Sequence, residues 1–167
     1  KIRIFIIHKD NNFLDFLSKK IINHKNLESI KVYKFDKKNI KFPNLNNNHI
    51  SEATYYRLYT SSYLPNDIKH ITYLDADTVC TNNPTNHIMR IQSKLDDNKS
   101  IAVKTEMDRQ PDTSALFDKL QMSSKKYFNA GVMVINLDLW KENNIEDKAR
   151  DKMVLLADKI QFWDQDI

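Results

Sequence analysis

Short apolar runs alternate along this chain with longer stretches in which apolar residues recur every three or four positions. The β-branched runs at residues 2–7 and 30–35 predict buried strands. Between them, residues 12–23 carry apolar side chains at the spacing of one helix face. Ser51 is a favourable cap for a helix over residues 52–64. The remaining expected elements are a polar loop at 37–50, strands at 70–74, 101–103 and 132–136, and helices at 86–95, 113–120, 137–143 and 145–160.

The alternation of strands and helices predicts an α/β layered fold with a largely parallel sheet. In such sheets, ligands bind beyond the carboxyl ends of the strands. Asp75 and Asp77 follow directly after the expected strand at residues 70–74. These two carboxylates therefore occupy a position where a ligand is expected.

The composition narrows the class of protein and excludes two kinds of phosphate site. The chain has 167 residues, of which 41% are hydrophobic and 29% charged, as in a single globular domain of ordinary size. No apolar run approaches the length of a membrane-spanning helix. Gly131 is the only glycine, so neither a GxGxxG dinucleotide loop nor a Walker A loop can form. A bound nucleotide must be held in another way.

Charge and cysteine content add further exclusions. The formal net charge is +4 and the isoelectric point is near 9.0. The lysines are spread among acidic residues rather than gathered with aromatic ones, so solvated helix faces account for the charge and a nucleic-acid partner is not expected. Cys80 is the only cysteine, which excludes a disulfide framework and a cysteine zinc site and is compatible with a reducing compartment.

The spacing of Asp75 and Asp77 suits a divalent cation. Residues i and i+2 of a strand point to the same face, about 6.5–7 Å apart, so their carboxylates can converge on one ion. Carboxylate oxygens are hard ligands that suit Mg²⁺ or Mn²⁺, and such an ion can neutralise a diphosphate without a glycine-rich loop. The same spacing recurs at residues 164–166, so the prediction rests on the position after an apolar strand rather than on the spacing alone.

An alternative interpretation of the first pair is a phosphatase site. Residues 74–79 read Leu-Asp-Ala-Asp-Thr-Val, which resembles the motif of haloacid dehalogenase-type phosphatases. In that family Asp75 would be the nucleophile and Asp77 the acid/base. The motif usually lies on the first strand of that fold, whereas here two expected strands and two expected helices precede it. This position counts against a phosphatase.

Four segments form an ordered set of motifs. They are residues 51–58 (Ser-Glu-Ala-Thr-Tyr-Tyr-Arg-Leu), 73–79 (Tyr-Leu-Asp-Ala-Asp-Thr-Val), 127–137 (Tyr-Phe-Asn-Ala-Gly-Val-Met-Val-Ile-Asn-Leu) and 163–167 (Trp-Asp-Gln-Asp-Ile). In this order and spacing they closely resemble the family 8 glycosyltransferases, which include bacterial lipopolysaccharide galactosyl- and glucosyltransferases and glycogenin. The resemblance spans nearly the whole chain and is strongest from Ser51 onward, which favours a glycosyltransferase over a phosphatase.

The resemblance implies a GT-A fold, a Rossmann-like mixed and mostly parallel sheet flanked by helices, as one catalytic domain over residues 1–167. It implies a retaining transfer of a hexose from a UDP-sugar donor to a saccharide or lipid-linked glycan acceptor, in lipopolysaccharide or surface glycan synthesis. The implied cofactor is Mn²⁺ (or Mg²⁺). The implied location is the cytoplasm, at the inner face of the membrane, with peripheral membrane association through a C-terminal part beyond this chain.

The resemblance also assigns roles to individual residues. Asp75 and Asp77 match the metal ligands, and Arg57 matches an arginine that reaches the donor sugar and its phosphates. Asp164 matches a residue that binds donor-sugar hydroxyls, and Gln165 matches the residue beneath the anomeric carbon; these two are the implied catalytic residues. The implied donor-binding residues are Arg57, Asp75, Ala76, Asp77, Asn129, Ala130, Gly131, Asp164 and Gln165.

These roles lead to an expected mechanism. A glutamine is a poor nucleophile, so Gln165 is expected to stabilise the oxocarbenium-like sugar with its carbonyl. The acceptor hydroxyl is expected to attack from the face that the leaving group departs and to lose its proton to the leaving phosphate. Gly131 is expected to allow close backbone packing beside the sugar, and Asp166 is expected to cap a following helix rather than bind a ligand.

Two parts of the family pattern are not found in this sequence. The family's first strand, with acidic, asparagine and tyrosine residues that hold uracil and ribose, has no match, and residues 2–10 resemble its second strand instead. A histidine and a lysine that follow the Asp-Gln-Asp motif also have no match. The domain is therefore expected to be incomplete at both ends, which leaves open a non-catalytic sugar-nucleotide-binding fragment. Ordinary structural roles are expected for His8, His24, His49, His70 and His87.

Overall fold

The computed structural model contains a parallel pair of strands joined by a short helical connection. β1 (Ile2–His8) pairs with β2 (Leu27–Lys34), and the link between them forms η1 (Asn11–Phe16) and α1 (Lys19–Ile22). The single helix expected at residues 12–23 is thus divided in two, with Ser18 capping α1 by accepting a hydrogen bond from the backbone of the second piece. The structure describes residues 1–45, 51–95 and 98–167.

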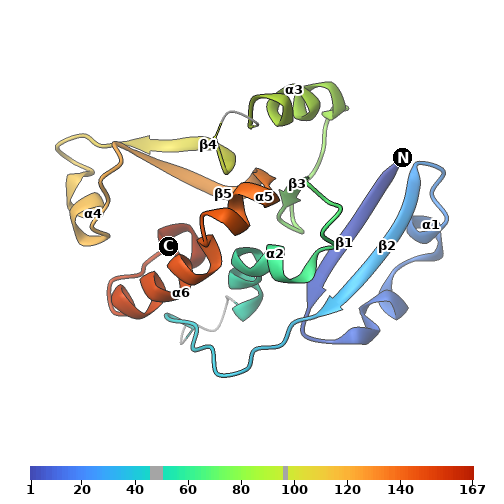
Figure 1. The fold of residues 1–167 in the computed structure, drawn as a ribbon, viewed down its shortest axis with the longest axis horizontal. Coiled ribbons are helices and arrows are strands. Elements are labelled where there is room, and N and C mark those ends of the chain that lie inside the picture. Colours follow the sequence, from blue (N-terminus) through green and yellow to red (C-terminus); the bar gives the residue numbers. More distant parts are fainter. Residues whose placement is uncertain (46–50, 96–97) are drawn as a thin grey trace.

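A second sheet holds three antiparallel strands. β5 (Lys126–Asn136) lies between β3 (His70–Leu74) and β4 (Ile101–Asp108), and it pairs with both in antiparallel register. The tip of the β4–β5 pair carries α4 (Ser114–Lys119) and lies at the opposite end of the molecule from β1 and β2 (Figure 1).

The α/β character is confirmed, but the mostly parallel sheet is not found among the described strands. Among these strands only β1 and β2 run parallel to one another. β5 lies between β3 and β4 and is antiparallel to both of them. The two sheets nevertheless share one hydrophobic core. Phe5 of β1 and Tyr33 of β2 pack against the cluster that contains Met133 and Ile135 of β5.

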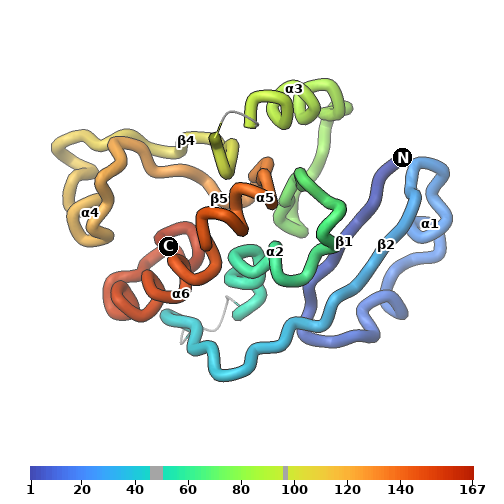
Figure 2. The backbone as a smooth tube through the Cα atoms, in the orientation of Figure 1, coloured from blue at the N-terminus to red at the C-terminus, as the bar shows by residue number. Residues whose placement is uncertain are grey.

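Helices from the C-terminal half of the chain pack against β5 of the second sheet. α3 (Thr85–Leu95) packs on β5, while α5 (Leu137–Glu142) continues directly from that strand into α6 (Ile145–Leu155). The chain then turns back into η3 (Trp163–Asp166), which contacts β5 (Figure 2). Within the described residues, none of the helices has the length and apolar content needed to cross a bilayer.

The helix expected at residues 52–64 is observed as η2 (Glu52–Tyr59) followed by α2 (Thr60–Tyr63). The predicted cap is confirmed, because the Ser51 side chain accepts a hydrogen bond from the backbone of Ala53. An aromatic cluster holds η2 in place: the rings of Phe35 and Tyr56 stack with centroids 3.9 Å apart. A segment that is buried on several sides in this way can keep a polar side chain in one fixed position.

Several element boundaries differ from those expected. β4 extends to Asp108 through a run of polar residues, β5 begins at Lys126 rather than 132, and α6 ends at Leu155 rather than 160. Residues 37–45 are irregular, as expected for a loop; residues 46–50, including His49, lie outside the described residues.

Candidate functional site

Arg57 connects the motif segments of the chain. Its guanidinium is 7% exposed. Nη1 donates a hydrogen bond to the carbonyl of Ala130 at 2.6 Å, and Nη2 donates to Asp75 Oδ1 at 2.7 Å. Nε donates to the carbonyl of Thr54 at 3.1 Å and lies 2.9 Å from Asp164 Oδ2. One side chain therefore joins η2, the turn after β3, β5 and η3.

The local sequence explains why this arginine is held so firmly. Tyr55, Tyr56, Leu58 and Tyr59 are all buried around it. The Arg57 guanidinium also lies over the ring of Tyr73, 4.3 Å from its centroid, which adds a cation–π contact. A buried cation is stable only when it is paired and hydrogen-bonded, and the Arg57 contacts provide both.

The Asp75 carboxylate and backbone are both anchored. Oδ1 accepts hydrogen bonds from Arg57 and, at 2.7 Å, from the hydroxyl of Tyr73. The Asp75 amide donates to the carbonyl of Gly131 at 2.8 Å, and its carbonyl accepts from the amide of Thr78 at 3.0 Å. The last of these bonds closes a turn over residues 75–78.

This turn corrects the geometry expected for the aspartate pair. β3 ends at Leu74, so Asp75 and Asp77 do not share the face of a strand. The chain instead turns sharply, leaving Asp75 half-buried against Arg57 and placing Ala76 and Asp77 at the exposed corner. Asp75 and Asp77 therefore lie in a turn that follows the strand, and strand alternation does not set their relative positions.

Gly131 makes room for the Asp75 carboxylate. A Cβ atom on Gly131 would lie 2.8 Å from Asp75 Oδ2 and 3.1 Å from Asn129 Oδ1. Asn129 is itself held in place, because its Oδ1 accepts a hydrogen bond from the Gly131 amide at 2.9 Å. The φ angle of Gly131 is not positive, so the requirement for glycine here is one of space.

Asp164 is buried behind Arg57. Its side chain is 5% exposed, and Oδ1 accepts a hydrogen bond from the hydroxyl of Thr54. Burial raises the pKa of Asp164 above its ordinary value, while the Arg57 charge and the Thr54 hydroxyl oppose that rise. Both carboxylate oxygens face protein groups, so Asp164 fixes the position of Arg57.

The side-chain amide of Gln165 is held at both ends. Oε1 accepts a hydrogen bond from the Ala130 amide at 3.2 Å, and Nε2 donates to Glu106 Oε2 at 2.8 Å. Glu106 was not expected from the sequence. It lies in the polar extension of β4, where neither an apolar pattern nor a motif marks it, and only the folded sheet brings it to Gln165.

Asp166 is hydrogen-bonded within the loop that leads into η3. Its Oδ1 accepts a hydrogen bond from the hydroxyl of Tyr127 at 2.6 Å. Its Oδ2 accepts from the backbone amides of Gln161 and Phe162, at 2.6 and 2.8 Å. These amides precede Asp166 in the chain, so the carboxylate closes the loop that leads into η3, and its role as a cap for a following helix stays a prediction.

The donor set at the Asp75 turn has the chemistry that a hard divalent cation prefers. Asp75 Oδ2 lies beside the space left by Gly131, and Asp77 presents a second, exposed carboxylate. In the part of the chain that the structure describes, no group of three or more His, Cys, Asp or Glu side chains is placed to hold a metal ion. These residues therefore fit an ion that takes further ligands from a bound phosphate or another segment.

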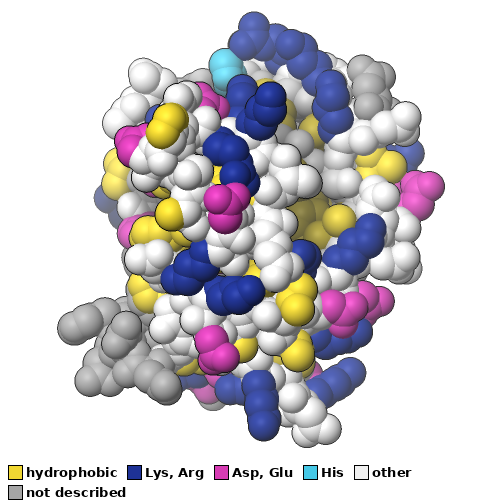
Figure 3. Space-filling view, turned by 90° about the vertical axis from the view of Figure 1, so that its left-hand side faces the viewer, with side chains coloured by type: hydrophobic (Ala, Val, Ile, Leu, Met, Phe, Trp, Pro, Cys, Tyr) yellow, Lys and Arg dark blue, Asp and Glu magenta, His cyan; other side chains and the backbone are white. Residues whose placement is uncertain are grey.

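His8 and His24, for which ordinary structural roles were expected, lie apart from the Arg57 network. His8 Nδ1 accepts a hydrogen bond from the amide of Asp10 at 3.0 Å, and His24 Nδ1 accepts from Asn26 at 3.3 Å. On the face shown in Figure 3, Lys and Arg side chains are interspersed with acidic and apolar ones.

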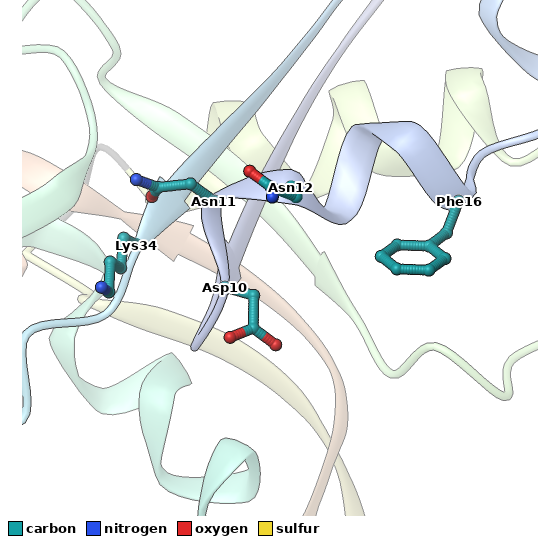
Figure 4. A pocket seen from close by; sticks show the side chains of 5 residues that line it. All are labelled: Asp10, Asn11, Asn12, Phe16 and Lys34. Carbon is teal, nitrogen blue, oxygen red and sulfur yellow. The ribbon is translucent and has the colours of Figure 1, made fainter.

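Two hollows also lie away from the Arg57 network. One, of about 390 Å³, lies at the carboxyl ends of β1 and β2 (Figure 4). The other, of about 790 Å³, lies between residues 35–41 and the helices α2 and α6. Neither is lined by a residue that was predicted to bind a donor. The first hollow is lined by Asp10, Asn11, Asn12, Phe16 and Lys34.

The chain matches the sequence model of Glycosyl transferase family 8 over residues 2–167, and it belongs to that family. It is 30% identical over 164 residues to a lipopolysaccharide 1,2-glucosyltransferase of Escherichia coli, covering 95% of this chain and 45% of that protein. It is 28% identical over 117 residues to a lipopolysaccharide 1,3-galactosyltransferase of Salmonella typhimurium, covering 69% of this chain and 34% of that protein. The chain thus spans less than half the length of these relatives.

The fold agrees with this assignment. The crystal structure of the galactosyltransferase LgtC in complex with donor and acceptor sugar analogues superposes with a TM-score of 0.68 at 22% identity, covering 99% of this chain and 68% of that one. The chain therefore has the GT-A fold. The family assignment gives no support to the haloacid dehalogenase interpretation of Asp75 and Asp77.

Proposed function

We propose that this chain carries the donor-binding part of a retaining glycosyltransferase. In this proposal a hexose moves from a UDP-sugar to a saccharide or lipid-linked glycan acceptor during lipopolysaccharide or surface glycan synthesis. Family membership and the lipopolysaccharide transferases among the relatives support it. The structural observation that carries it is the Arg57 network, which ties the Asp75 turn, the backbone of Ala130 and the Asp164 carboxylate into one site.

The diphosphate of the donor would lie at the Asp75 turn. A Mn²⁺ (or Mg²⁺) ion held by Asp75 and Asp77 would supply positive charge there. Arg57 adds a fixed cation beside it, and its bonds to Ala130 and Asp75 prevent the guanidinium from moving when charge develops on the leaving group. Ala76, in the same turn, would contact the donor through the backbone.

The donor sugar would lie over residues 129–131 and 164–165. Asn129, Ala130 and Gly131 form one wall, and the lack of a side chain at Gly131 leaves room beside it for the Asp75 carboxylate. Asp164 would bind donor hydroxyls by exchanging one of its present contacts. Gln165 Oε1 has one lone pair beyond the bond from Ala130, which can stabilise positive charge at the anomeric carbon.

Retention follows if attack and departure use the same face of the sugar. The bond from the anomeric carbon to the acceptor oxygen forms while the bond to the phosphate oxygen breaks. The proton of the acceptor hydroxyl passes to the departing phosphate, so no protein base is required. Gln165 remains uncharged throughout and keeps its position.

We also propose that residues 1–167 form an incomplete GT-A domain. The strands β1 and β3 each pair on one edge only among the described residues, and the two edges lie toward one another (Figure 1). The shared packing of Phe5 and Tyr73 on the same cluster supports a common sheet plane for the two halves. The enzyme is proposed to act in the cytoplasm at the inner face of the membrane, with a C-terminal part beyond this chain as its membrane contact.

The test uses the full-length protein that contains this chain, with UDP-hexoses, Mn²⁺ and a glycan acceptor. Asp75→Ala and Asp77→Ala are expected to abolish metal-dependent turnover of the donor. Asp151→Ala removes an exposed aspartate on α6 and serves as the matched control. Metal-dependent turnover that survives both changes would overturn the assignment, and donor binding without any turnover would favour a non-catalytic sugar-nucleotide-binding protein.

A further inference from the structure

We propose that Glu106 is a positioning residue that sets the orientation of the Gln165 amide. Glu106 Oε2 accepts a hydrogen bond from Gln165 Nε2 at 2.8 Å, and the Ala130 amide donates to Gln165 Oε1 at 3.2 Å. A carboxylate can only accept hydrogen bonds and a backbone amide can only donate them. The two contacts therefore select one of the two ways in which the Gln165 amide can face.

The backbone of β4 is shaped to place Glu106 there. Thr105 pairs with Phe128 and Met107 pairs with Tyr127, so Glu106 is the extra residue of a β-bulge. A bulge redirects the side chain of the unpaired residue and is common beside functional sites. The bulge thus accounts for a glutamate that leaves the strand alternation and meets Gln165 of η3.

A second irregularity in the β4–β5 pairing lies next to this bulge. The register between β4 and β5 passes from Val103–Met133 directly to Lys104–Asn129. Ala130 and Gly131, which lie in this interruption, supply the amide that holds Gln165 and the carbonyl that holds the Asp75 turn. Both irregularities therefore place a backbone or side-chain group beside Gln165. The Ala130 amide on β5 can only donate a hydrogen bond, and the Glu106 carboxylate on β4 can only accept one.

The consequence for the reaction rests on the proposed function. With Glu106 holding Nε2, the free lone pair of Gln165 Oε1 stays in a constant direction relative to the sugar. Without Glu106, the amide keeps the 3.2 Å contact to Ala130 and a hydrogen bond to the Tyr127 hydroxyl, but it loses its bond to a charged acceptor and is held less firmly about its last torsion. Misplacement of an active-site group by about 1 Å can cost about 100-fold in rate. Glu106→Ala is expected to lower kcat about 10- to 100-fold with a donor KM within about twofold of the original.

The first experiment tests the contact without any assay of activity. The side-chain amide resonances of Gln165 are assigned by their loss in Gln165→Ala and are then compared in Glu106→Ala, Glu106→Gln and Glu142→Ala. Glu106→Ala is expected to shift the Gln165 resonances, while Glu142→Ala, which changes an exposed glutamate on α5, leaves them in place. Unchanged Gln165 resonances in Glu106→Ala would overturn the proposal.

A second experiment separates positioning from a general effect on structure. In the full-length protein, Glu106→Gln keeps a carbonyl that can accept from Gln165 Nε2, so it is expected to retain more of kcat than Glu106→Ala. Equal losses in both variants, or a loss expressed only in donor KM, would contradict the positioning role. If the unaltered protein shows no transfer with any UDP-hexose, the proposed function fails while the resonance test still decides the Glu106–Gln165 contact.

The pair can also be tested by exchanging its two partners. Gln165→Glu alone sets two carboxylates against each other at a hydrogen-bond distance, and it is expected to lower the thermal midpoint. Adding Glu106→Gln restores a donor opposite an acceptor and is expected to recover most of that loss. A double variant no more stable than Gln165→Glu alone would show that the two side chains do not interact, against the proposal.

Discussion

Glycine is required at position 131 by space rather than by backbone conformation, because any side chain there would collide with the Asp75 carboxylate. Its φ is not positive, so a larger residue would meet no backbone strain. The obstacle is Asp75 Oδ2, 2.8 Å from the Cβ position. Because Oδ1 of the same carboxylate is held by Arg57 and Tyr73, the group cannot rotate away without losing those bonds.

Gly131→Ala is therefore expected to impair the Asp75 turn more than the fold. In the full-length protein, the affinity for Mn²⁺–UDP should fall at least about 10-fold, equivalent to about 1.4 kcal/mol. The thermal midpoint should move by only a few degrees, because the contact concerns one half-exposed carboxylate. Calorimetric titration and a thermal scan provide the two measurements. Val132→Ile, which enlarges a 45% exposed neighbour on β5, is the control, and equal affinities in the two variants would contradict the steric explanation.

Arg57→Lys tests the buried ion pair. A lysine has one point of charge and cannot reach Thr54, Ala130, Asp75 and Asp164 together, as the guanidinium does. The carboxylate of Asp164 would remain buried with a weaker partner, so the free energy of unfolding is expected to fall by about 3 kcal/mol.

Chemical denaturation of the two arginine-to-lysine variants provides the comparison. Arg109 pairs with Asp118 at 2.6 Å, but Asp118 is 68% exposed, so Arg109→Lys should cost less than about 1 kcal/mol. A loss at Arg57 no larger than that at Arg109 would mean that the buried network contributes little to stability.

The residues of the site could be predicted only where a motif contains them. Arg57, Asp75 and Gln165 each belong to a segment with a recognisable order and spacing, and the structure brings all three into one network. Glu106 has no such signal. Its contact with Gln165 spans 59 residues and depends on a bulge, which no local pattern of apolar and polar positions encodes.

At the scale of elements, η2 shows how one helix start is stabilised. Glu52 accepts hydrogen bonds from Lys37 Nζ at 2.5 Å and from the hydroxyl of Tyr56 at 2.7 Å. The Lys37 bond first, and the Tyr56 bond second, lower the pKa of Glu52 below its ordinary value of 4.5. A lowered pKa means that the ionised carboxylate stabilises the folded chain above about pH 4.5, and that this contribution is lost as the pH falls through the folded-state pKa.

Glu52→Gln is accordingly expected to lower the free energy of unfolding by about 1 kcal/mol at pH 7. At pH 3 the difference from the unaltered chain should shrink, because Glu52 is then becoming protonated in both folded and unfolded states. Urea denaturation at the two pH values provides the measurement. A difference of the same size at both would show that the charge of Glu52 is not the cause.

The elements themselves were predicted well where a continuous apolar run marks them and poorly where polar residues interrupt the apolar positions. The strands β1, β2 and β3 coincide closely with apolar runs, because their side chains enter the shared core. The outer half of β4 was missed because Lys104 and its neighbours are polar and exposed, and the outer half of β5 was missed because polar residues interrupt its buried positions Tyr127 and Ala130. Those halves form a two-stranded extension that packs Tyr127 and Met107 against the cluster around Phe117 and Leu156, and contacts between residues so distant in sequence leave no local apolar period to detect.

For the whole molecule, the class of fold could be predicted but the direction of the strands could not. Alternating strands and helices favour an α/β arrangement, and parallel order is the usual consequence of helical crossovers. Here β4 and β5 are joined through α4 without a crossover over the sheet, so β5 returns antiparallel (Figure 1). The packing of Phe5 and Tyr33 on the β5 cluster then unites the two sheets in one core.

The isolated 167-residue chain is expected to bind Mn²⁺–UDP weakly. Within the described residues the proposed metal site offers two carboxylates, one of them already bonded to Arg57 and Tyr73, and no third His, Cys, Asp or Glu completes it. Among the described residues, β1 and β3 belong to two separate sheets that are joined by side-chain packing rather than by strand pairing, which lowers the rigidity that a donor site requires. Calorimetry on this chain should give a dissociation constant weaker than about 0.1 mM, or less than about 5.5 kcal/mol of binding. Asp75→Asn sets the background, and a low-micromolar constant that this change abolishes would mean that residues 1–167 already form a complete donor site, contrary to the proposal of an incomplete domain.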